Sequence, residues 1–338
     1  MQTLRLYVAL RQGVAAMLVV GFVLVVGCAS TPDGDKHESS GGTEEITLDL
    51  ERGPLGLMLR EMSEVSSLNV VLMNGLELAQ TGPYRFEKRE PKAAIGDIAR
   101  DLGYEIHEAP HYVFVYAPGY EVLRDVVVED RLDDRTAALR VDAAFGADTP
   151  LCSGLALLGH TLGHTIVADN AIGGAACGEI RLRDVPLATA LEALLQSARV
   201  SRDSFYVEST PEYTFLASVN NKPRPQLLIN KASLTEEQRG TLERRVSVTL
   251  AFLQGDPEHL KGRIGASTLG EVLDALSEQL GLPVTSDARM HKLPVNPVVM
   301  RDVSIGTALE LIIRQWLLPE FGYELEGAGI RLRHLSAP

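Results

Sequence analysis

Two histidines give the most obvious opportunity for chemistry in this chain. His160 and His164 lie four residues apart in LLGHTLGHT, and this spacing places two imidazoles on one face of a helix. A zinc site needs a third and usually a fourth ligand, and only Asp169 and His107 are weak candidates to complete it. The pattern is therefore insufficient for a metal site, and we expect none.

The remaining motifs predict neither an active site nor a cofactor. The sequence lacks a G-x-S-x-G elbow, a P-loop, an HExxH helix and a dinucleotide-binding fingerprint. A hydrolase with an unfamiliar site would require a cluster of titratable groups with perturbed pKa values. The net charge is −13, and −15 without the first 27 residues, so nucleic acid is a poor partner. We expect a protein that is not an enzyme and binds no nucleic acid.

The first 27 residues have the pattern of a signal peptide. Arg5 and Arg11 precede an apolar run, residues 14–26, which would rise only about 20 Å as a helix, too short for a comfortable bilayer span. The run ends in Val-Val-Gly-Cys, which resembles the bacterial lipobox. The resemblance implies cleavage before Cys28 and lipidation of its thiol; an ordinary signal peptide or an uncleaved anchor is the alternative. Because Ala29 follows the cysteine, the lipoprotein sorting rule favours a periplasm-facing outer-membrane lipoprotein over the inner membrane or secretion.

Residues 28–45 contain almost no apolar side chain beyond the lipobox cysteine, and we interpret them as a flexible tether. Beyond Cys28, the chain has two cysteines, Cys152 and Cys177. An even pair outside the cytosol predicts a disulfide, worth roughly 3 kcal/mol for a loop of this length. Two buried free thiols are the alternative.

The chain repeats itself at constant spacing. LRDVPLATALEALL and MRDVSIGTALELII agree at seven of fourteen positions. A leucine opens an amphipathic run in three places, an apolar strand follows 15 residues later, and an alanine of a second helix follows 24 residues after that. The residues are Leu55, Val70 and Ala94, then Leu151, Ile166 and Ala190, then Leu269, Val284 and Ala308. Three agreements on two spacings predict three copies of one folding unit.

Each copy reads as β-α-β-β-α-β-β, with two helices packed on a small sheet, so the predicted fold class is α+β. Alternating short strands with Pro or Gly between them predict a hairpin at the end of each copy. We place the modules at residues 46–118, 138–218 and 246–335, with a linker at residues 219–245. In that linker, Ser233 and Glu236 fit a capping box that starts a polar helix, and the stretch YEVLRDVVV before the second module looks like a strand.

The combination of a strand, a helix ending near Leu-Gly-Leu, a short strand, RDVPLATALEALL and a hairpin resembles the secretin and TonB short N-terminal domain. This resemblance implies periplasmic modules that bind protein partners. No secretin pore or receptor barrel pattern follows, so we do not expect the chain to form the channel itself. The repeated Arg183-Asp184 and Arg301-Asp302 pairs come just before a helix, where Asp fits turn and helix-start positions, and we interpret them as structural.

These patterns favour a cell-envelope adaptor that binds a protein of a secretin, type IV pilus or TonB-linked assembly. Exposed sheet edges bind a partner strand through main-chain hydrogen bonds, without a diagnostic side-chain motif. We expect such edges in the terminal hairpins. The residues are Tyr112, Val113, Phe114, Ile330 and Leu332. The alternative is a module that binds peptidoglycan or another envelope ligand, which would require a concave site lined with aromatic side chains.

Overall fold

The computed structural model describes residues 45–221, 227–250, 267–317 and 321–335. Its fold is mixed α+β, as the sequence predicts, with helices alternating between several small sheets. The predicted signal peptide, the lipidation site at Cys28 and nearly all of the tether lie outside the described residues. No helix in these ranges is both long and apolar enough to cross a bilayer.

Three segments of the chain share one order of elements, and we call them the first, second and third segments. The first segment runs from β1 to β5. Pro91 occupies the first position of its second helix, where a missing N–H costs nothing. Its elements are β1 (Ile46–Leu50), α1 (Leu55–Ser66), β2 (Val70–Leu72), β3 (Tyr84–Arg89), α2 (Pro91–Asp101), β4 (Glu105–Glu108) and β5 (Val113–Tyr116).

The second segment repeats this order and adds two short strands and a one-turn helix. Gly163 ends its first long helix in the left-handed conformation, which glycine adopts without strain. Its elements are β6 (Arg140–Phe145), β7 (Thr149–Pro150), α4 (Leu151–Leu162), β8 (Thr165–Ala168), α5 (Asn170–Gly173), β9 (Ala176–Cys177), β10 (Ile180–Pro186), α6 (Leu187–Ser197), β11 (Phe205–Ser209) and β12 (Tyr213–Ser218), with the short helix η3 (Arg202–Ser204) before β11.

The third segment has the same order once more. Thr268 and Glu271 form a capping box at the start of its first helix. Its elements are β13 (Arg245–Leu250), β14 (Ser267–Thr268), α8 (Leu269–Leu280), β15 (Val284–Ser286), β16 (Pro294–Val295), β17 (Val298–Ser304), α9 (Ile305–Ile313), β18 (Phe321–Glu326) and β19 (Gly329–His334).

The strand pairing is the same in all three segments. The first strand pairs antiparallel with the strand before the second helix, as in β1 with β3, β6 with β10, and β13 with β17. The last strand of each segment has two partners. In the first segment, β5 pairs antiparallel with its hairpin partner β4 and parallel with β2, the strand after the first helix. The other two sets are β12 with β11 and β8, and β19 with β18 and β15.

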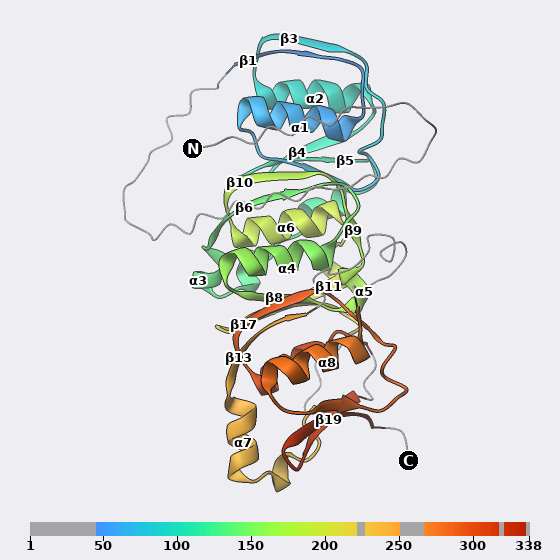
Figure 1. The fold of residues 1–338 in the computed structure, drawn as a ribbon. Helices are drawn as coiled ribbons and strands as arrows, with labels where there is room; N and C mark the ends of the chain where they lie inside the picture. The colour runs from blue at the N-terminus through green and yellow to red at the C-terminus, as the bar shows by residue number, and fades with distance from the viewer. Residues whose placement is uncertain (1–44, 222–226, 251–266, 318–320, 336–338) are drawn as a thin grey trace, which may run out of the picture.

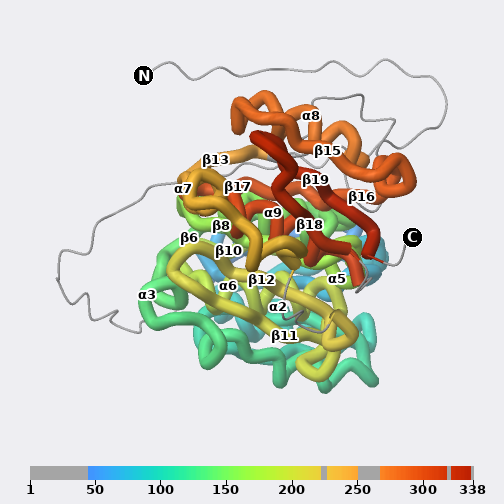
Figure 2. The backbone as a smooth tube through the Cα atoms, turned by 90° about the horizontal axis from the view of Figure 1, so that it is seen from below, coloured from blue at the N-terminus to red at the C-terminus, as the bar shows by residue number. Residues whose placement is uncertain are grey.

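The segments are stacked so that helical and sheet layers alternate along the molecule (Figure 1). Between the first two segments, β2 pairs with β10 and creates one five-stranded sheet in the order β4-β5-β2-β10-β6. One hydrophobic core joins these two segments, and a second core fills the third segment and includes Val167, Phe215 and Ala217 of the second. Viewed from below, the third segment lies in front of the second, with the first behind both (Figure 2).

Both connections between segments differ from their predicted form. YEVLRDVVV forms the 3-10 helix η1 (Glu121–Asp125) instead of a strand, and η2 (Glu129–Arg131) and α3 (Asp134–Ala137) follow it. Leu123, Val126 and Val128 of this connection are buried, so it belongs to the core. In the second connection, which also contains η4 (Lys231–Ser233), α7 (Glu236–Glu243) begins after a capping box made by Thr235 and Gln238, two residues beyond the predicted pair.

Candidate functional site

The hairpin residues expected at exposed edges are buried in the interior of sheets. β5 lies between β4 and β2, and β19 lies between β15 and β18. The expectation was wrong because each hairpin's last strand also pairs with the strand after the first helix, which leaves it no free edge. The five side chains are at most 3% exposed: Tyr112, Val113, Phe114, Ile330 and Leu332.

The predicted disulfide is absent, because Cys152 and Cys177 are free and buried. Cys177 directs its thiol toward the carbonyl oxygen of Leu194, 3.8 Å away. Burial raises the pKa of the Cys152 thiol to about 11 and raises that of Cys177 as well, so both stay protonated at neutral pH. The alternative of two buried thiols is the correct one.

The two histidines point to different partners. His164 Nε2 lies 3.0 Å from the hydroxyl of Thr214, and burial lowers the pKa of this histidine against the opposing charge of Asp133. His160 Nδ1 lies 3.0 Å from the guanidinium of Arg301. Within the described ranges, no group of three or more His, Cys, Asp or Glu side chains is arranged to hold a metal ion.

The repeated Arg-Asp pair has a structural role that differs from the predicted one. Asp184 and Asp302 lie at register shifts in β10 and β17, with positive φ angles of 49° and 47°, a conformation that Asp tolerates better than most residues. Lys88 occupies the corresponding place in β3, with φ 48°. The helix caps are Pro186 and Ser304 instead. The motif therefore forms a β-bulge in front of a helix.

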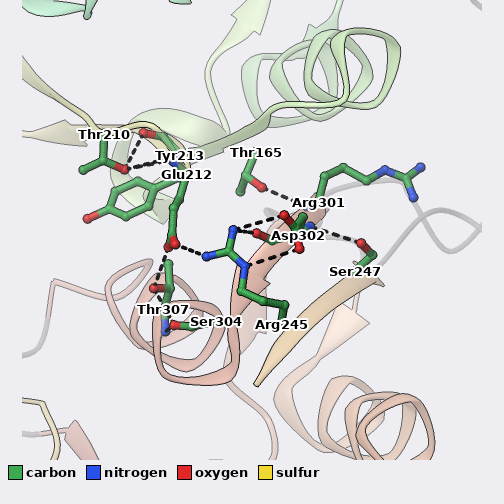
Figure 3. A network of polar contacts seen from close by, with 10 residues as sticks. All are labelled: Thr165, Thr210, Glu212, Tyr213, Arg245, Ser247, Arg301, Asp302, Ser304 and Thr307. Atoms are coloured by element: carbon green, nitrogen blue, oxygen red, sulfur yellow. Dashed lines mark hydrogen bonds and ion pairs between the residues drawn. The ribbon is translucent and has the colours of Figure 1, made fainter. Parts of the chain in front are cut away.

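In the second and third segments, an arginine of the first strand forms hydrogen bonds with the aspartate of the bulge. Arg140 Nε donates to a carboxylate oxygen of Asp184 at 2.9 Å, and the same guanidinium donates to the Asp184 carbonyl. Arg245 contacts Asp302 in the same two ways and also reaches Glu212 of the second segment (Figure 3). Bidentate arginine contacts of this kind fix geometry well.

Two junctions, one between the first and second segments and one between the second and third, are held by polar contacts that correspond position by position. Residues of the first and second segments correspond at an offset of 96, and those of the second and third at 118. At the first junction, the side chain of Asn69 accepts the Arg183 N–H at 2.8 Å. At the second, the hydroxyl of Thr165 accepts the Arg301 N–H at 2.9 Å (Figure 3).

A second pair of bonds between segments also recurs. The Asn74 N–H donates to the Ser197 carbonyl at 2.9 Å, and the Asn170 N–H donates to the Gln315 carbonyl at 2.8 Å. Asn74 corresponds to Asn170 and Ser197 corresponds to Gln315 under the same offsets. The junction is therefore a reproducible way of joining one segment to the next.

The first junction brings two backbones into direct contact. Ile180 and Arg181 of β10 pair with β2, and the Leu72 N–H donates to the Glu179 carbonyl at 2.8 Å. A Cβ on Gly178 would lie 2.3 Å from the Leu72 carbonyl oxygen, so only glycine permits this approach. Glu179 anchors the edge through Arg60 of α1, at 2.9 Å.

Among the described strands, the second junction lacks the strand ladder of the first. β8 lies opposite β17 without a ladder between them in the described sheets. Asn296 replaces Gly178, and its amide donates to the Ala168 carbonyl at 3.1 Å. Arg314, only 11% exposed, binds Glu208, with Nη1 and Oε1 3.1 Å apart, and its guanidinium carbon lies 4.2 Å from the Phe215 ring centroid.

Electrostatics in this second junction favour the ion pair. Burial tends to raise the pKa of Glu208, but hydrogen bonds from Arg314 and Tyr213 and the charge of Arg314 lower it overall. Burial opposes the charge of Arg314, yet the bond to Glu208 raises the pKa of the guanidinium. Both groups therefore remain charged across the neutral range.

Comparisons with protein family models, with curated proteins and with solved structures found no match. The geometry of the chain itself therefore carries the functional argument. At the upper end of the stack, β3 is paired only with β1 among the described strands. Its equivalents β10 and β17 each face the preceding segment, so β3 presents the same kind of strand edge, and the described residues include no segment before it. Sequence reasoning missed this edge, although the offset of 96 residues relates it to β10.

Proposed function

We propose that the protein is a non-enzymatic cell-envelope adaptor. In this proposal Cys28 carries the lipid, the chain is attached to the periplasmic face of the outer membrane, and residues 28–45 hold the segments away from the bilayer. The segments bind a protein of a secretin, type IV pilus or TonB-linked assembly.

The observation that best supports this proposal is that the outer edge of β3 pairs with no other described strand. In the same chain, the equivalent position on β10 accepts an antiparallel strand through main-chain hydrogen bonds. Strand addition to an exposed edge is a general mode of protein recognition. The lipobox pattern and the resemblance to the secretin and TonB short N-terminal domain support the envelope setting.

The test is affinity purification of the tagged full chain from detergent-solubilised membranes, with wild type beside Cys28→Ala. We expect palmitate labelling and outer-membrane fractionation of wild type, both lost in the variant, and recovery of a secretin, pilus or TonB-linked protein with wild type. Recovery of cell-wall fragments alone would overturn the adaptor and favour the envelope-ligand alternative.

A further inference from the structure

The first segment retains the backbone groups that make a junction. Glu87 corresponds to Arg183 and Arg301, whose N–H groups bond to the preceding segment. Asp101 corresponds to Ser197 and Gln315, whose carbonyls accept from the preceding segment. Glu87 and Asp101 are both exposed. The upper face of the first segment therefore has the donor and the acceptor that the other two segments use.

A glycine strengthens this correspondence. Gly82 occupies the position of Gly178, which glycine must fill because the backbone of the preceding segment comes so close. No atom lies within 4 Å of a Cβ built on Gly82, and its φ is not in the left-handed region. Neither the packing nor the backbone of the first segment requires a glycine there, whereas an incoming strand that pairs as β2 pairs with β10 would.

The first segment also has a positive charge at a position where the second segment has one. Arg85 of β3 corresponds to Arg181 of β10, which is paired with Glu179 at 2.7 Å and is also stabilised by Glu64 of α1 in the preceding segment. The side chain of Arg85 is 73% exposed and contacts only Glu87 of its own strand among the ion pairs of the described residues. An incoming segment with an acidic side chain in place of Glu64 would meet this exposed cation.

The opposite end of the stack lacks the complementary groups. Pro283 occupies the position of Asn69 and Thr165, and a proline side chain accepts no hydrogen bond. The Ser277 hydroxyl accepts the Val284 N–H at 2.9 Å and donates to the Leu273 carbonyl at 2.7 Å, so the Val284 N–H already has a partner. Val284 corresponds to Val70, which pairs with β10. A proline and a satisfied backbone protect an edge strand from further pairing. The third segment of a second copy is therefore a poor occupant for β3.

We propose that β3 is a docking edge for a different protein that ends in an unpaired strand of the same architecture. This partner strand would run antiparallel to β3, follow an Asn, Thr or Ser that accepts the Glu87 N–H, and come with an acidic side chain facing Arg85. Pro283 and Ser277 act as a cap that keeps the chain from occupying its own edge. The proposal rests on the adaptor function, because it names the chemistry of the protein partner.

Removing the cap tests the edge without the partner. Detergent-solubilised full chain carrying Pro283→Asn and Ser277→Ala is mixed with wild-type chain bearing a second tag, and co-purification is measured. We expect the uncapped chain to retain at least tenfold more wild-type chain than a capped copy does. Gly82→Ala in the recipient should abolish the gain, because a Cβ at the corresponding Gly178 would collide with the neighbouring carbonyl, whereas Gly240→Ala, equally free of neighbours but on α7, should not. No gain on uncapping, with a retained thermal unfolding transition, or a gain insensitive to Gly82→Ala, would overturn the proposal.

The partner recovered from membranes provides a second test that does not depend on the uncapped variant. Gly82→Ala should reduce its recovery at least tenfold, and Gly240→Ala should leave it unchanged. Undiminished recovery with Gly82→Ala would refute the docking edge while the adaptor function stands. Failure to recover any envelope-assembly protein with wild type would refute the adaptor function itself.

Discussion

The two junctions join equivalent strands by different means. At the first, Gly178 lets the backbones approach until β2 and β10 form a ladder. At the second, Asn296 occupies the corresponding position, and its side chain spans the gap to the Ala168 carbonyl. Leu72 and Ala168 correspond as well: the Leu72 carbonyl accepts from the Ser197 hydroxyl at 2.8 Å, and the Ala168 carbonyl accepts from the Asn296 amide. Gly178 therefore permits a shared sheet at the first junction, whereas Asn296 joins the second by a side-chain hydrogen bond.

Some contacts recur at both junctions, and others differ between them. The bonds that recur involve main-chain groups, at Arg183 and Arg301 and at Ser197 and Gln315. The charged contacts differ, with Arg60 and Glu179 at one junction and Arg314 and Glu208 at the other. Main-chain geometry persists through sequence change because every residue except proline carries the same donor and acceptor.

The largest effect should come from Gly178→Ala. The new Cβ would lie 2.3 Å from the Leu72 carbonyl oxygen and 2.9 Å from the Asn74 nitrogen, so the ladder must open. We expect a loss of about 3 kcal/mol in the free energy of unfolding, from overpacking and broken hydrogen bonds. Urea denaturation measures it. Asn296→Ala, at the corresponding position, removes one bond and should cost about 1 kcal/mol; equal losses would contradict this account of the two junctions.

Arg314→Met tests the ion pair of the second junction. It leaves the carboxylate of Glu208, 34% exposed, without its partner. We expect a loss of about 3 kcal/mol, at the low end for a broken buried pair because Glu208 is partly solvated. The control is Arg245→Met. Arg245 is 44% exposed and binds Glu212 at the same junction, so its loss should cost much less than the loss of Arg314. If Arg245→Met lowered the free energy of unfolding as much as Arg314→Met, the exposed contacts of Arg245 would contribute as much stability as the Arg314–Glu208 pair.

The same pair should make the second junction sensitive to acid. Because the folded pKa of Glu208 lies below its ordinary value of 4.5, its stabilisation is present above pH 4.5 and lost as the pH falls through the lower folded pKa. Urea midpoints measured from pH 7 to pH 3 should therefore fall less in Glu208→Gln than in wild type. Parallel pH curves would show that Glu208 does not contribute. The effect should be smaller than that of Arg314→Met.

The smallest effect should come from reducing agent. Cys177 lies next to Gly178 at the first junction, and Val295 takes its place at the second, which is consistent with a packing role. We expect dithiothreitol to leave the free energy of unfolding unchanged, because no disulfide is present. A thiol reagent should modify Cys152 and Cys177 only after unfolding. A loss near 3 kcal/mol on reduction would indicate a disulfide after all.

Much of the local structure follows from short-range pattern. The leucines at 55, 151 and 269 begin α1, α4 and α8, as predicted, because an extended residue followed by an apolar run of helical period starts a helix. Short-range pattern could not predict which strand edges are exposed and which are covered by a neighbouring strand. Alternation identifies a strand but says nothing of its neighbours, and β5 and β19 became central because the strand after the first helix adds beside them.

The sequence by itself determined the mixed α+β class, the three helix starts and the constant offsets between segments, because period and spacing are local properties of the chain. The tertiary structure alone decided which strand edges are covered, that Cys152 and Cys177 remain free, and that the Arg-Asp repeat forms a bulge. It also explained Gly178, whose need arises from a carbonyl more than 100 residues earlier in the chain. Contacts between distant segments depend on how whole layers pack, and no window of sequence contains both sides of them.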